Sequence, residues 1–404
     1  MSRSTIVGAV EIGTSKVVVL VAEMSGGRSM NIIGRGQSTN LGMKKGEIVN
    51  LRSVSDCTHA AILAAERSSG TKIEHVYLSF SGSHLWGFRH AGTTSISSNR
   101  GLVRSVDIER AVENAKSRAL EPGEVYIHHI RNGFLLDGKP VEDPLSRQGS
   151  HLEVLYWHVV ADEQKVKDHI TVINGFGLDV NDMVVSSLAS GSFLATEEEK
   201  RQGALVVDIG KGTTDYVLYR GRRAVQTGVI PVGGEHVTND LGLGLRVKTK
   251  LAEGLKRRAA KALVQKEDRT KKAALLGDLS IGDSFHSQLT INKITHARLE
   301  ELFIILKNQL GSALSRTSLP GGVILTGGVS KTPLIADLAE VTLDVPVSLG
   351  QSPDWVRHAE LREPEYATVL GLLLNALHDQ QSEEKEPQVK AQGHWLRKVA
   401  GLFG

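Results

Sequence analysis

Residues Ala204–Asp215 read ALVVDIGKGTTD, and this stretch decides the fold. Its first part, Ala204–Gly210, is an almost unbroken apolar run, which predicts a strand that is buried on both faces of a sheet. The run carries Asp208 near its end and passes into a loop of glycine and threonine. Backbone N–H groups and hydroxyls in such a loop can approach a phosphate closely. A second strand is predicted directly afterwards, over Thr214–Tyr219. The pattern favours an α/β protein with a phosphate site at the end of the buried strand.

A similar loop lies about half a chain earlier. Residues Glu11–Lys16 read EIGTSK and stand between two further predicted strands, Thr5–Val10 and Lys16–Val21. Each loop has an acid at a strand end, then glycine, then threonine or serine. Two such loops facing each other would hold a triphosphate from both sides, while Glu11 and Asp208 would hold a hydrated Mg²⁺. Taken alone, each loop could equally be an ordinary glycine turn.

A third glycine element follows a predicted strand in the last quarter of the chain. Residues Gly322–Ser330 read GVILTGGVS and precede a predicted helix that contains Pro333. A buried strand that ends in Gly-Gly and opens on a helix lets a ring or a phosphate approach the backbone. Gly233 and Gly234 open another predicted helix and provide a similar approach beside the second loop.

In this order, the three elements resemble the phosphate-1, phosphate-2 and adenosine motifs of the actin/hexokinase/heat-shock-chaperone ATPase superfamily. Within it the chain resembles the FtsA family of bacterial division proteins over essentially its whole length. Ala252–Lys256 (AEGLK) resembles the family's Ala-Glu-x-Ile/Leu-Lys element, which approaches the ribose and adenine. Tyr366–Leu372 (YATVLGL) resembles the second connecting helix, and Ser187–Ser190 falls where the first one begins. The resemblance implies an α/β protein with the actin-like ATPase fold: two ribonuclease-H-like lobes around a nucleotide cleft, with an inserted small α+β (1C-type) subdomain.

The domains that this resemblance implies alternate along the chain. They are residues 1–84 (first part of the lobe I core, 1A), 85–161 (the 1C-type subdomain), 162–190 (second part of the lobe I core), 191–245 (first part of the lobe II core, 2A), 246–310 (a partner-binding 2B-type subdomain), 311–360 (second part of the lobe II core), 361–378 (the returning helix of lobe I), 379–392 (a flexible linker) and 393–404 (an amphipathic membrane-targeting helix).

The resemblance also implies ATP and Mg²⁺ as cofactors. Asp208 and Glu11 are expected to orient the metal and a water, with Asp208 the stronger candidate, in a protein with at most weak ATPase activity. Three departures from the family bear on hydrolysis: Glu11 replaces the commoner Asp, Lys211 replaces a glycine, and Arg257–Ala260 replaces Tyr-Gly. The residues expected to bind the nucleotide are Gly13, Thr14, Ser15, Lys16, Gly210, Lys211, Gly212, Thr213, Thr214, Gly233, Gly234, Glu253, Lys256, Gly327, Gly328 and Ser330.

Composition excludes several classes of protein. The 404 residues are 40% hydrophobic and 23% charged, which is typical of a globular chain of two or three domains and not of a disordered one. A formal net charge of +3 does not indicate a general nucleic-acid binder. The single cysteine, Cys57, excludes an intramolecular disulfide. Charged residues interrupt the N-terminal apolar stretch, and no apolar run reaches the length of about 18 residues that a membrane span needs. We expect a cytoplasmic protein.

The C-terminal residues predict a membrane contact. Residues 379–392 are polar and predict a flexible tether. Beyond them the apolar side chains fall on one face of a helical wheel and the cations lie on or beside the other, as in helices that lie in a membrane interface. The alternative is a helix that docks on the protein's own body. The residues expected to touch an anionic membrane surface are Trp395, Leu396, Arg397, Lys398, Val399, Leu402 and Phe403.

A basic stretch begins the predicted 2B-type subdomain. Residues 246–272 carry 11 basic and 3 acidic side chains, and they contain no aromatic residue for base stacking, so nucleic acid is not an expected partner. In the FtsA family this subdomain binds the C-terminal tail of FtsZ, and the resemblance implies the same partner here. Lys293, Arg298 and Lys307, on a helix predicted over 293–314, are the expected contacts. Ordinary exposed helix charges are the alternative.

The resemblance therefore implies an ATP-binding adaptor of bacterial cell division. Such a protein polymerises with itself and tethers FtsZ filaments to the inner face of the cytoplasmic membrane at the division site. It meets other divisome proteins through the 1C-type subdomain. Two alternatives share the nucleotide motifs, namely a small-molecule kinase of the same superfamily and a pilus-type ATP-binding scaffold. The predicted tether and membrane helix weigh against both.

Overall fold

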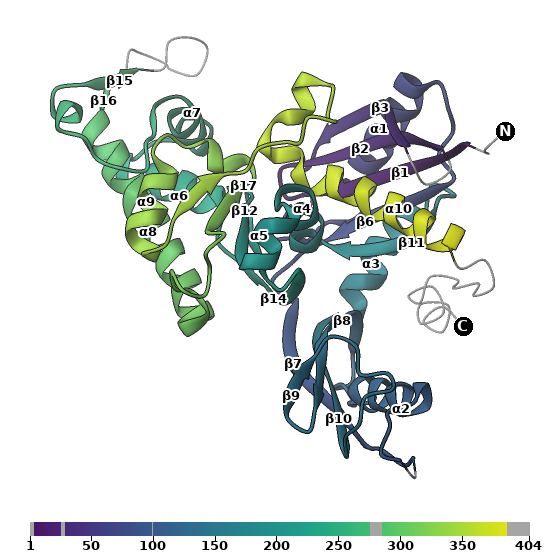
Figure 1. Ribbon diagram of the computed structural model, residues 1–404. Coiled ribbons are helices and arrows are strands. Elements are labelled where there is room, and N and C mark those ends of the chain that lie inside the picture. Colours follow the sequence, from purple (N-terminus) through teal and green to yellow (C-terminus); the bar gives the residue numbers. More distant parts are fainter. Residues whose placement is uncertain (1–3, 26–28, 99, 275–284, 386–404) are drawn as a thin grey trace.

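The computed structural model describes residues 4–25, 29–98, 100–274 and 285–385. Figure 1 shows two lobes side by side, with a smaller body that projects from them. This arrangement agrees with the two predicted lobes and the inserted subdomain. Within the described ranges, no helix combines the length and the apolar character needed to cross a membrane.

Each lobe is built on a five-stranded mixed sheet, and the two sheets share one topology. In each sheet three consecutive strands form an antiparallel meander, and two later strands add beside the first strand and run parallel to it. The strands of lobe I, in sheet order, are β11 (Asp179–Val185), β6 (His75–Phe80), β1 (Ser4–Ile12), β2 (Lys16–Ser25) and β3 (Ser29–Thr39). Those of lobe II are β18 (Val347–Leu349), β17 (Val323–Thr326), β12 (Ala204–Ile209), β13 (Thr214–Arg220) and β14 (Arg223–Ile230).

Helices cover both faces of each sheet. The outer faces carry α1 (Leu51–Ser69) and α3 (Glu163–Asn174) in lobe I, and α6 (Gly234–Leu245), α8 (Gln288–Leu310) and α9 (Ile335–Leu343) in lobe II. Short elements complete the lobes: the hairpin β4 (Met43–Lys44) and β5 (Glu47–Ile48), the helices α5 (Glu197–Gln202) and α7 (Thr249–Ala259), and the hairpin β15 (Lys272–Ala274) and β16 (Phe285–Ser287). The central strands are therefore buried on both sides, as the apolar run at Ala204 predicted.

Helices α4 (Ser186–Leu194) and α10 (Ala367–Lys385) lie between the two sheets. One hydrophobic core contains side chains of β1 and β2 from lobe I, of β12 and β13 from lobe II, and of both helices. The helices pack very closely, because a Cβ on Gly371 would lie 1.9 Å from the carbonyl oxygen of Ala189. This shared core fixes the loops at the strand ends of one lobe relative to those of the other lobe.

The inserted subdomain is a separate α+β unit. Its sheet has the order β7-β10-β8-β9, formed by β7 (Trp86–Ser95), β10 (His151–Asp162), β8 (Glu124–Leu136) and β9 (Lys139–Val141). Helix α2 (Ser105–Lys116) packs on this sheet, where a Cβ on Gly92 would lie 2.0 Å from the carbonyl oxygen of Ala111. The subdomain has its own small apolar core.

The flexible tether predicted over 379–392 is wrong for its first part. Helix α10 continues to Lys385, and Asp379 accepts a hydrogen bond from the hydroxyl of Tyr77 at 2.9 Å. The polar residues of this stretch include good helix formers, so a helix already nucleated by its buried N-terminal half extends through them. The rest of the predicted tether and the predicted membrane helix lie outside the described residues.

Asp182 on β11 and Asp379 on α10 form a pair of acids that makes the stability of the fold depend on pH. Burial, and secondly the charge of Asp379, raise the pKa of Asp182 on β11 to about 7. Such an acid destabilises the folded state wherever the unfolded chain holds it ionised, and this cost grows from about pH 4 to about pH 7. We expect Asp182→Asn to raise the free energy of unfolding by about 1–2 kcal/mol at pH 8, and by less than half as much at pH 5. Denaturant titrations at the two pH values measure this difference.

Asp179→Asn is the matched control, because Asp179 is exposed at the start of the same strand. This control should change stability little at either pH. An equal gain for both variants, or a gain for Asp182→Asn that does not depend on pH, would contradict the expectation.

Candidate functional site

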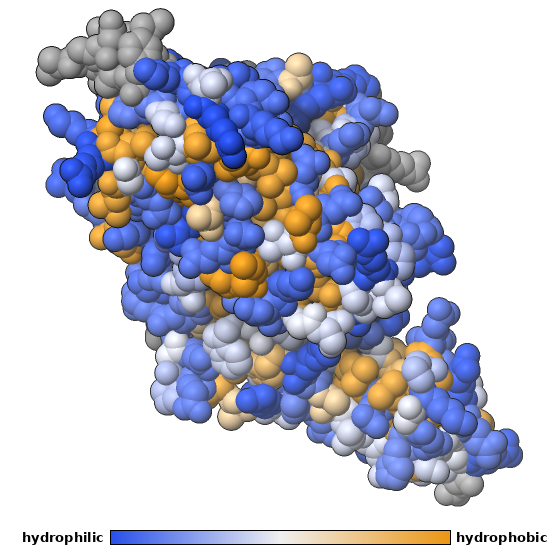
Figure 2. All heavy atoms as spheres, turned by 90° about the vertical axis from the view of Figure 1, so that its left-hand side faces the viewer, coloured by the Kyte–Doolittle hydropathy of each residue, from blue (hydrophilic) through white to orange (hydrophobic). Residues whose placement is uncertain are grey.

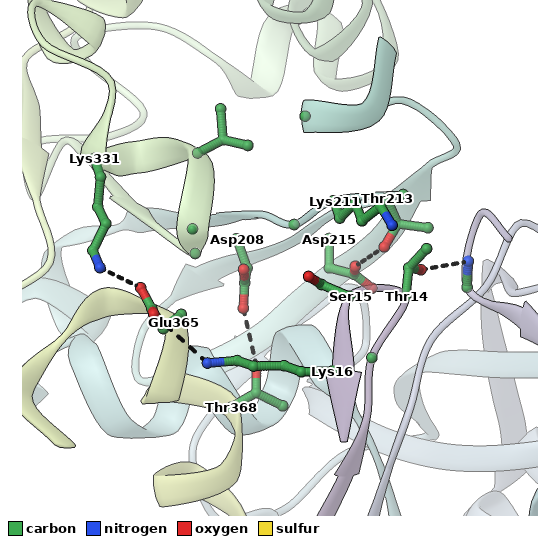
Figure 3. A pocket seen from close by; sticks show the side chains of 18 of the residues that line it. Thr14, Ser15, Lys16, Asp208, Lys211, Thr213, Asp215, Lys331, Glu365 and Thr368 are labelled. Carbon is green, nitrogen blue, oxygen red and sulfur yellow. Dashed lines mark hydrogen bonds and ion pairs between the residues drawn. The ribbon is translucent and has the colours of Figure 1, made fainter. Parts of the chain in front are cut away.

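A cleft of about 640 Å³ lies between the lobes. It is lined by the two loops singled out in the sequence, by the turn at Gly327 and Gly328 after β17 (the Gly-Gly turn) and by the start of α10. The loops meet each other, because a Cβ on Gly212 would lie 2.7 Å from Thr14 Oγ1. Figure 3 shows side chains from both loops around the same space. The fold thus brings together two segments that are half a chain apart.

The two loops are structural equivalents. Between β1 and β2, the N–H of Gly13 donates to the carbonyl oxygen of Lys16 at 3.0 Å. Between β12 and β13, the N–H of Gly210 donates to the carbonyl oxygen of Thr213 at 2.9 Å. The same local sequence pattern therefore produces the same closed turn in both lobes. Each turn follows a central strand that carries an acid just before its end.

Three of the five carboxyl groups that line the cleft have raised pKa values, and burial is the main cause for each. Burial and the charge of Asp208 raise the pKa of Glu11 to about 8. Burial raises the pKa of Asp208 to about 6, although the hydroxyl of Thr368 donates to it at 3.0 Å. Burial raises the pKa of Asp215 to about 7, although the hydroxyl of Ser81 donates to it at 2.6 Å. Within the described ranges, Glu11 Oε2 is a buried atom with no hydrogen-bond partner. Such a group of acids favours the binding of a cation or the protonation of its carboxyl groups.

Sequence reasoning missed Asp215, Ser81 and Thr368 as parts of this site. A signal for Asp215 was present, because it is an acidic residue directly before the mainly apolar run Tyr216–Tyr219 of the same strand. Ser81 follows β6 and Thr368 lies on α10, so only the tertiary structure brings them to the loops. No local pattern marks these two hydroxyls as site residues.

A cluster of ion pairs joins the first loop to the Gly-Gly turn. Glu365 lies 3.6 Å from Lys16 Nζ and 2.6 Å from Lys331 Nζ, and Lys331 also pairs with Glu363 at 2.7 Å. The ammonium of Lys16 lies 4.0 Å from the centroid of the Tyr366 ring. The cluster therefore connects lobe I with lobe II across the cleft, as the dashed lines in Figure 3 show. Neither Glu365 nor Lys331 was among the predicted site residues.

The wall near α7 is a hydrogen-bonded polar group. Lys256 Nζ lies 2.6 Å from Glu253 Oε2 and donates to the carbonyl oxygen of Gly234 at 2.9 Å. Thr238 donates to the same carboxylate, and Arg257 lies 2.6 Å from its other oxygen. Burial by itself would raise the pKa of Glu253, but the hydrogen bonds from Lys256 and Thr238 outweigh it and lower this pKa to about 2. These side chains are therefore fixed by one another.

Most of the predicted nucleotide-binding residues line the cleft, and three do not. The hydroxyl of Thr214 donates to the carbonyl oxygen of Val232 at 2.8 Å, and that of Ser330 donates to Gly327 at 2.7 Å. Gly233 packs behind the second loop. The predicted residues that line the cleft are Gly13, Thr14, Ser15, Lys16, Gly210, Lys211, Gly212, Thr213, Gly234, Glu253, Lys256, Gly327 and Gly328, with Glu11 and Asp208.

The predicted partner contacts lie on α8, outside the cleft lining. Lys293 and Lys307 are exposed, and Lys307 donates to the carbonyl oxygen of Thr342 at 2.9 Å. Arg298 is half-buried and pairs with Asp240 at 2.6 Å, so its charge is already matched within the chain. The residues predicted to touch the membrane lie outside the described part of the chain.

Comparison with known families gives two matches. The family described as "Cell division protein FtsA" matches residues 205–371, and the one described as "SHS2 domain inserted in FTSA" matches residues 82–161. The cell division protein FtsA of Pseudomonas aeruginosa is 33% identical over 390 residues, which cover 94% of this chain and 91% of that protein. FtsA of Borreliella burgdorferi is 31% identical and covers 100% of this chain and 99% of its own length. FtsA of Escherichia coli is 29% identical, with coverages of 98% and 97%.

Solved structures share the fold at lower identity. A chain of the PilM–PilN type IV pilus biogenesis complex superposes with a TM-score of 0.64 at 18% identity, over 93% of this chain and 99% of that one. MreB5 of Spiroplasma citri bound to ADP gives a TM-score of 0.56 at 13% identity, over 94% and 98%. These likenesses concern the fold alone. They confirm the predicted actin-like ATPase fold.

The Gly-Gly turn allows a test with neighbouring residues. Gly327 has a φ of +83°, and a Cβ there would lie 2.3 Å from Asp208 Oδ1 and 2.6 Å from the carbonyl oxygen of Ile209. We expect Gly327→Ala to lower the free energy of unfolding by about 2 kcal/mol or more. At Gly328 no atom of the described residues lies within 4 Å of a Cβ, so Gly328→Ala should change this free energy by less than about 0.5 kcal/mol. Urea unfolding compares the two variants, and equal losses would show that the turn is not tightly packed.

Proposed function

This chain belongs to the FtsA family of cell division proteins, and we propose that it is an ATP-binding adaptor that polymerises and attaches FtsZ filaments to the inner face of the cytoplasmic membrane. The observation that carries the nucleotide part is the pair of equivalent loops that meet across one cleft. A ligand held by both loops would fix the lobes relative to each other. Through this restraint, ATP would control assembly.

The residues of the cleft fit a nucleoside triphosphate. A volume of about 640 Å³ lies within the range of small-molecule sites. Glycines stand where the loops approach each other most closely, so backbone N–H groups remain accessible to phosphate oxygens. The phosphates would lie between Gly13–Lys16 and Gly210–Thr213. The adenosine would lie toward Glu253, Lys256 and the Gly-Gly turn.

The carboxylates of the cleft also fit a hydrated Mg²⁺. Among the described residues, no group of three or more His, Cys, Asp or Glu side chains is arranged to ligate a metal directly. Mg²⁺ in phosphate sites does not need such a group, because it keeps several waters and uses one or two carboxylates plus the phosphates. The side chains that would hold it are Asp208 and Glu11, whose buried Oε2 has no hydrogen-bond partner among the described residues. When bound, the ion would neutralise phosphate charge.

We propose that ATP acts chiefly as an assembly ligand, with at most weak hydrolysis. Asp208 and Glu11 would order the metal and a water. Asp215 is an additional carboxylate, and the hydroxyls of Thr213 and Ser81 fix its two oxygens at 3.0 and 2.6 Å. Because both of its oxygens already accept hydrogen bonds, we assign Asp215 a role in holding the loop instead of the role of a general base.

The membrane part of the proposal rests on the sequence of residues 393–404. Two cations near an anionic leaflet contribute about 1 kcal/mol each. Four large apolar side chains, partly buried among lipid headgroups, add about a few kcal/mol more. One such segment would bind weakly and reversibly. Several segments on one polymer would gain on the order of 10² to 10⁴ in avidity, so firm attachment would require assembly.

The proposed FtsZ surface lies on lobe II. Figure 2 looks onto this lobe and shows apolar side chains gathered among charged ones. Ile304 on α8 and Val341 on α9 are 45% and 78% exposed, and Lys307, one turn from Ile304, reaches the residue after Val341. A surface of exposed apolar side chains beside a cation suits a peptide with both apolar and acidic residues. This supports Lys293 and Lys307 as contacts more than Arg298, which is paired with Asp240.

A small-molecule kinase is the second candidate, because a cleft that holds a nucleotide between two loops would serve phosphoryl transfer equally well. A phosphoryl-transfer screen separates the candidates, since transfer to a small acceptor would favour the kinase. The likeness to the pilus complex shows only a common fold, and the match over residues 82–161 favours the division family over a pilus-type scaffold.

The proposal predicts that membrane binding requires both the C-terminal residues and nucleotide. We expect the full chain to sediment with anionic liposomes, and Mg-ATP to raise the bound fraction by about tenfold or more through avidity. A chain truncated after Gln392 should stay in the supernatant with or without Mg-ATP. Sedimentation with vesicles of phosphatidylglycerol and phosphatidylethanolamine measures both effects.

Vesicles of neutral lipid provide the control for charge attraction. If the truncated chain bound as well as the full chain, or if neither bound, residues 393–404 would not be an anchor. The chain would then be a nucleotide-binding protein without this tethering role.

A further inference from the structure

Lys211 is a cation of the cleft without a side-chain partner among the described residues. Five basic side chains line the cleft: Lys16, Lys211, Lys256, Arg257 and Lys331. Among the residues that the structure describes, each of the other four forms an ion pair at 3.6 Å or less. For Lys211 neither a hydrogen bond nor an ion pair of the side chain is found within these ranges. Its charge is therefore available to a ligand, whereas the other four are held by Glu253, Glu363 and Glu365.

The backbone of Lys211 is firmly held even though its side chain is not. Its carbonyl oxygen accepts a hydrogen bond from the N–H of Glu235 at 2.8 Å. The carbonyl oxygen of the preceding Gly210 accepts one from Gly234 at 2.9 Å. A Cβ on Gly233 would lie 2.7 Å from the Lys211 carbonyl oxygen, so α6 begins directly against this loop. A flexible cationic side chain thus projects from a fixed point.

This fixed point lies at the end of the cleft where the two loops meet. The next residue, Gly212, touches Thr14 of the first loop. Figure 3 shows Lys211 beside Thr213 and Asp215. In a nucleotide held between the loops, the phosphate farthest from the base is the group that both loops can reach. The Lys211 ammonium can reach the same place.

We propose that Lys211 binds the terminal phosphate of a nucleoside triphosphate and makes this chain distinguish the triphosphate from the diphosphate. The inference rests on the proposed nucleotide function and adds a specificity-determining residue to it. A glycine at this position would offer the phosphate only its backbone N–H. A lysine adds a charged hydrogen bond that the diphosphate, which lacks that phosphate, cannot use.

The charge of the surrounding cleft makes such a contact effective. Five acidic and five basic side chains line the cleft, so the lining as a whole carries no excess of acids over bases that would repel a phosphate. A charge-assisted hydrogen bond in a cleft between two lobes is stronger than one in bulk solvent. We expect the contact to contribute about tenfold or more to triphosphate affinity.

The test compares two variants of Lys211 in the full chain. Lys211→Met keeps the aliphatic stem and removes the charge, whereas Lys211→Arg keeps the charge. Dissociation constants for Mg-ATP and Mg-ADP are measured by calorimetry for each. We expect Lys211→Met to lose tenfold or more in ATP affinity while its ADP affinity stays within threefold of the parent chain. Lys211→Arg should retain most of the ATP preference.

Lys167→Met is the control for loss of a lysine elsewhere, because Lys167 pairs with Glu163 on α3, away from the cleft lining. Unchanged ADP binding by Lys211→Met shows that the variant is folded. If the parent chain binds both nucleotides and Lys211→Met keeps the same ratio of affinities, or loses both equally, the inference is overturned and the proposed function stands. If the parent chain binds neither nucleotide, the proposed function fails and the inference fails with it.

Discussion

The burial of three carboxyl groups where the two lobes meet is the constraint on which the rest of the structure depends. Glu11 and Asp208 lie just before the ends of equivalent central strands, and Asp215 is paired with Asp208 on β13, the strand beside β12. Burial raises their pKa values to about 8, 6 and 7, which measures how unfavourable their charges are without a ligand. The shared core around α4 and α10 holds the two strands in place despite this cost. A cationic or metal-bound ligand would relieve it.

Ion pairs near these acids connect the two lobes across the cleft. Glu365, which lies just before the start of α10, pairs with Lys16 from lobe I and with Lys331 from lobe II. A nucleotide that contacts both loops would connect the same two lobes as these ion pairs. The lobes that would bind the nucleotide also carry the inserted subdomain and the α8–α9 face. A change in the relative position of the lobes would therefore move these surfaces directly.

The sequence was sufficient to predict site residues that follow directly on a predicted strand in one local pattern. The EIGTSK and DIGKGTTD loops could be predicted because acid, glycine and hydroxyl residues follow one another directly. The partners of these loops could not. Ser81 and Thr368 reach the acids only through the fold, and Glu365 precedes a helix in a segment with no motif of its own. The tether was misjudged because polar residues do not by themselves end a helix that buried residues have already started.

The central claim is that both loops hold one ligand at the same time. Backbone amide hydrogen exchange of the full chain, with and without Mg-ATP, tests it most directly. We predict slower exchange in Gly13–Lys16 and in Gly210–Thr213 together, over the same range of ATP concentration. Protection of only one loop, or of neither at an ATP concentration that saturates binding, would contradict the claim.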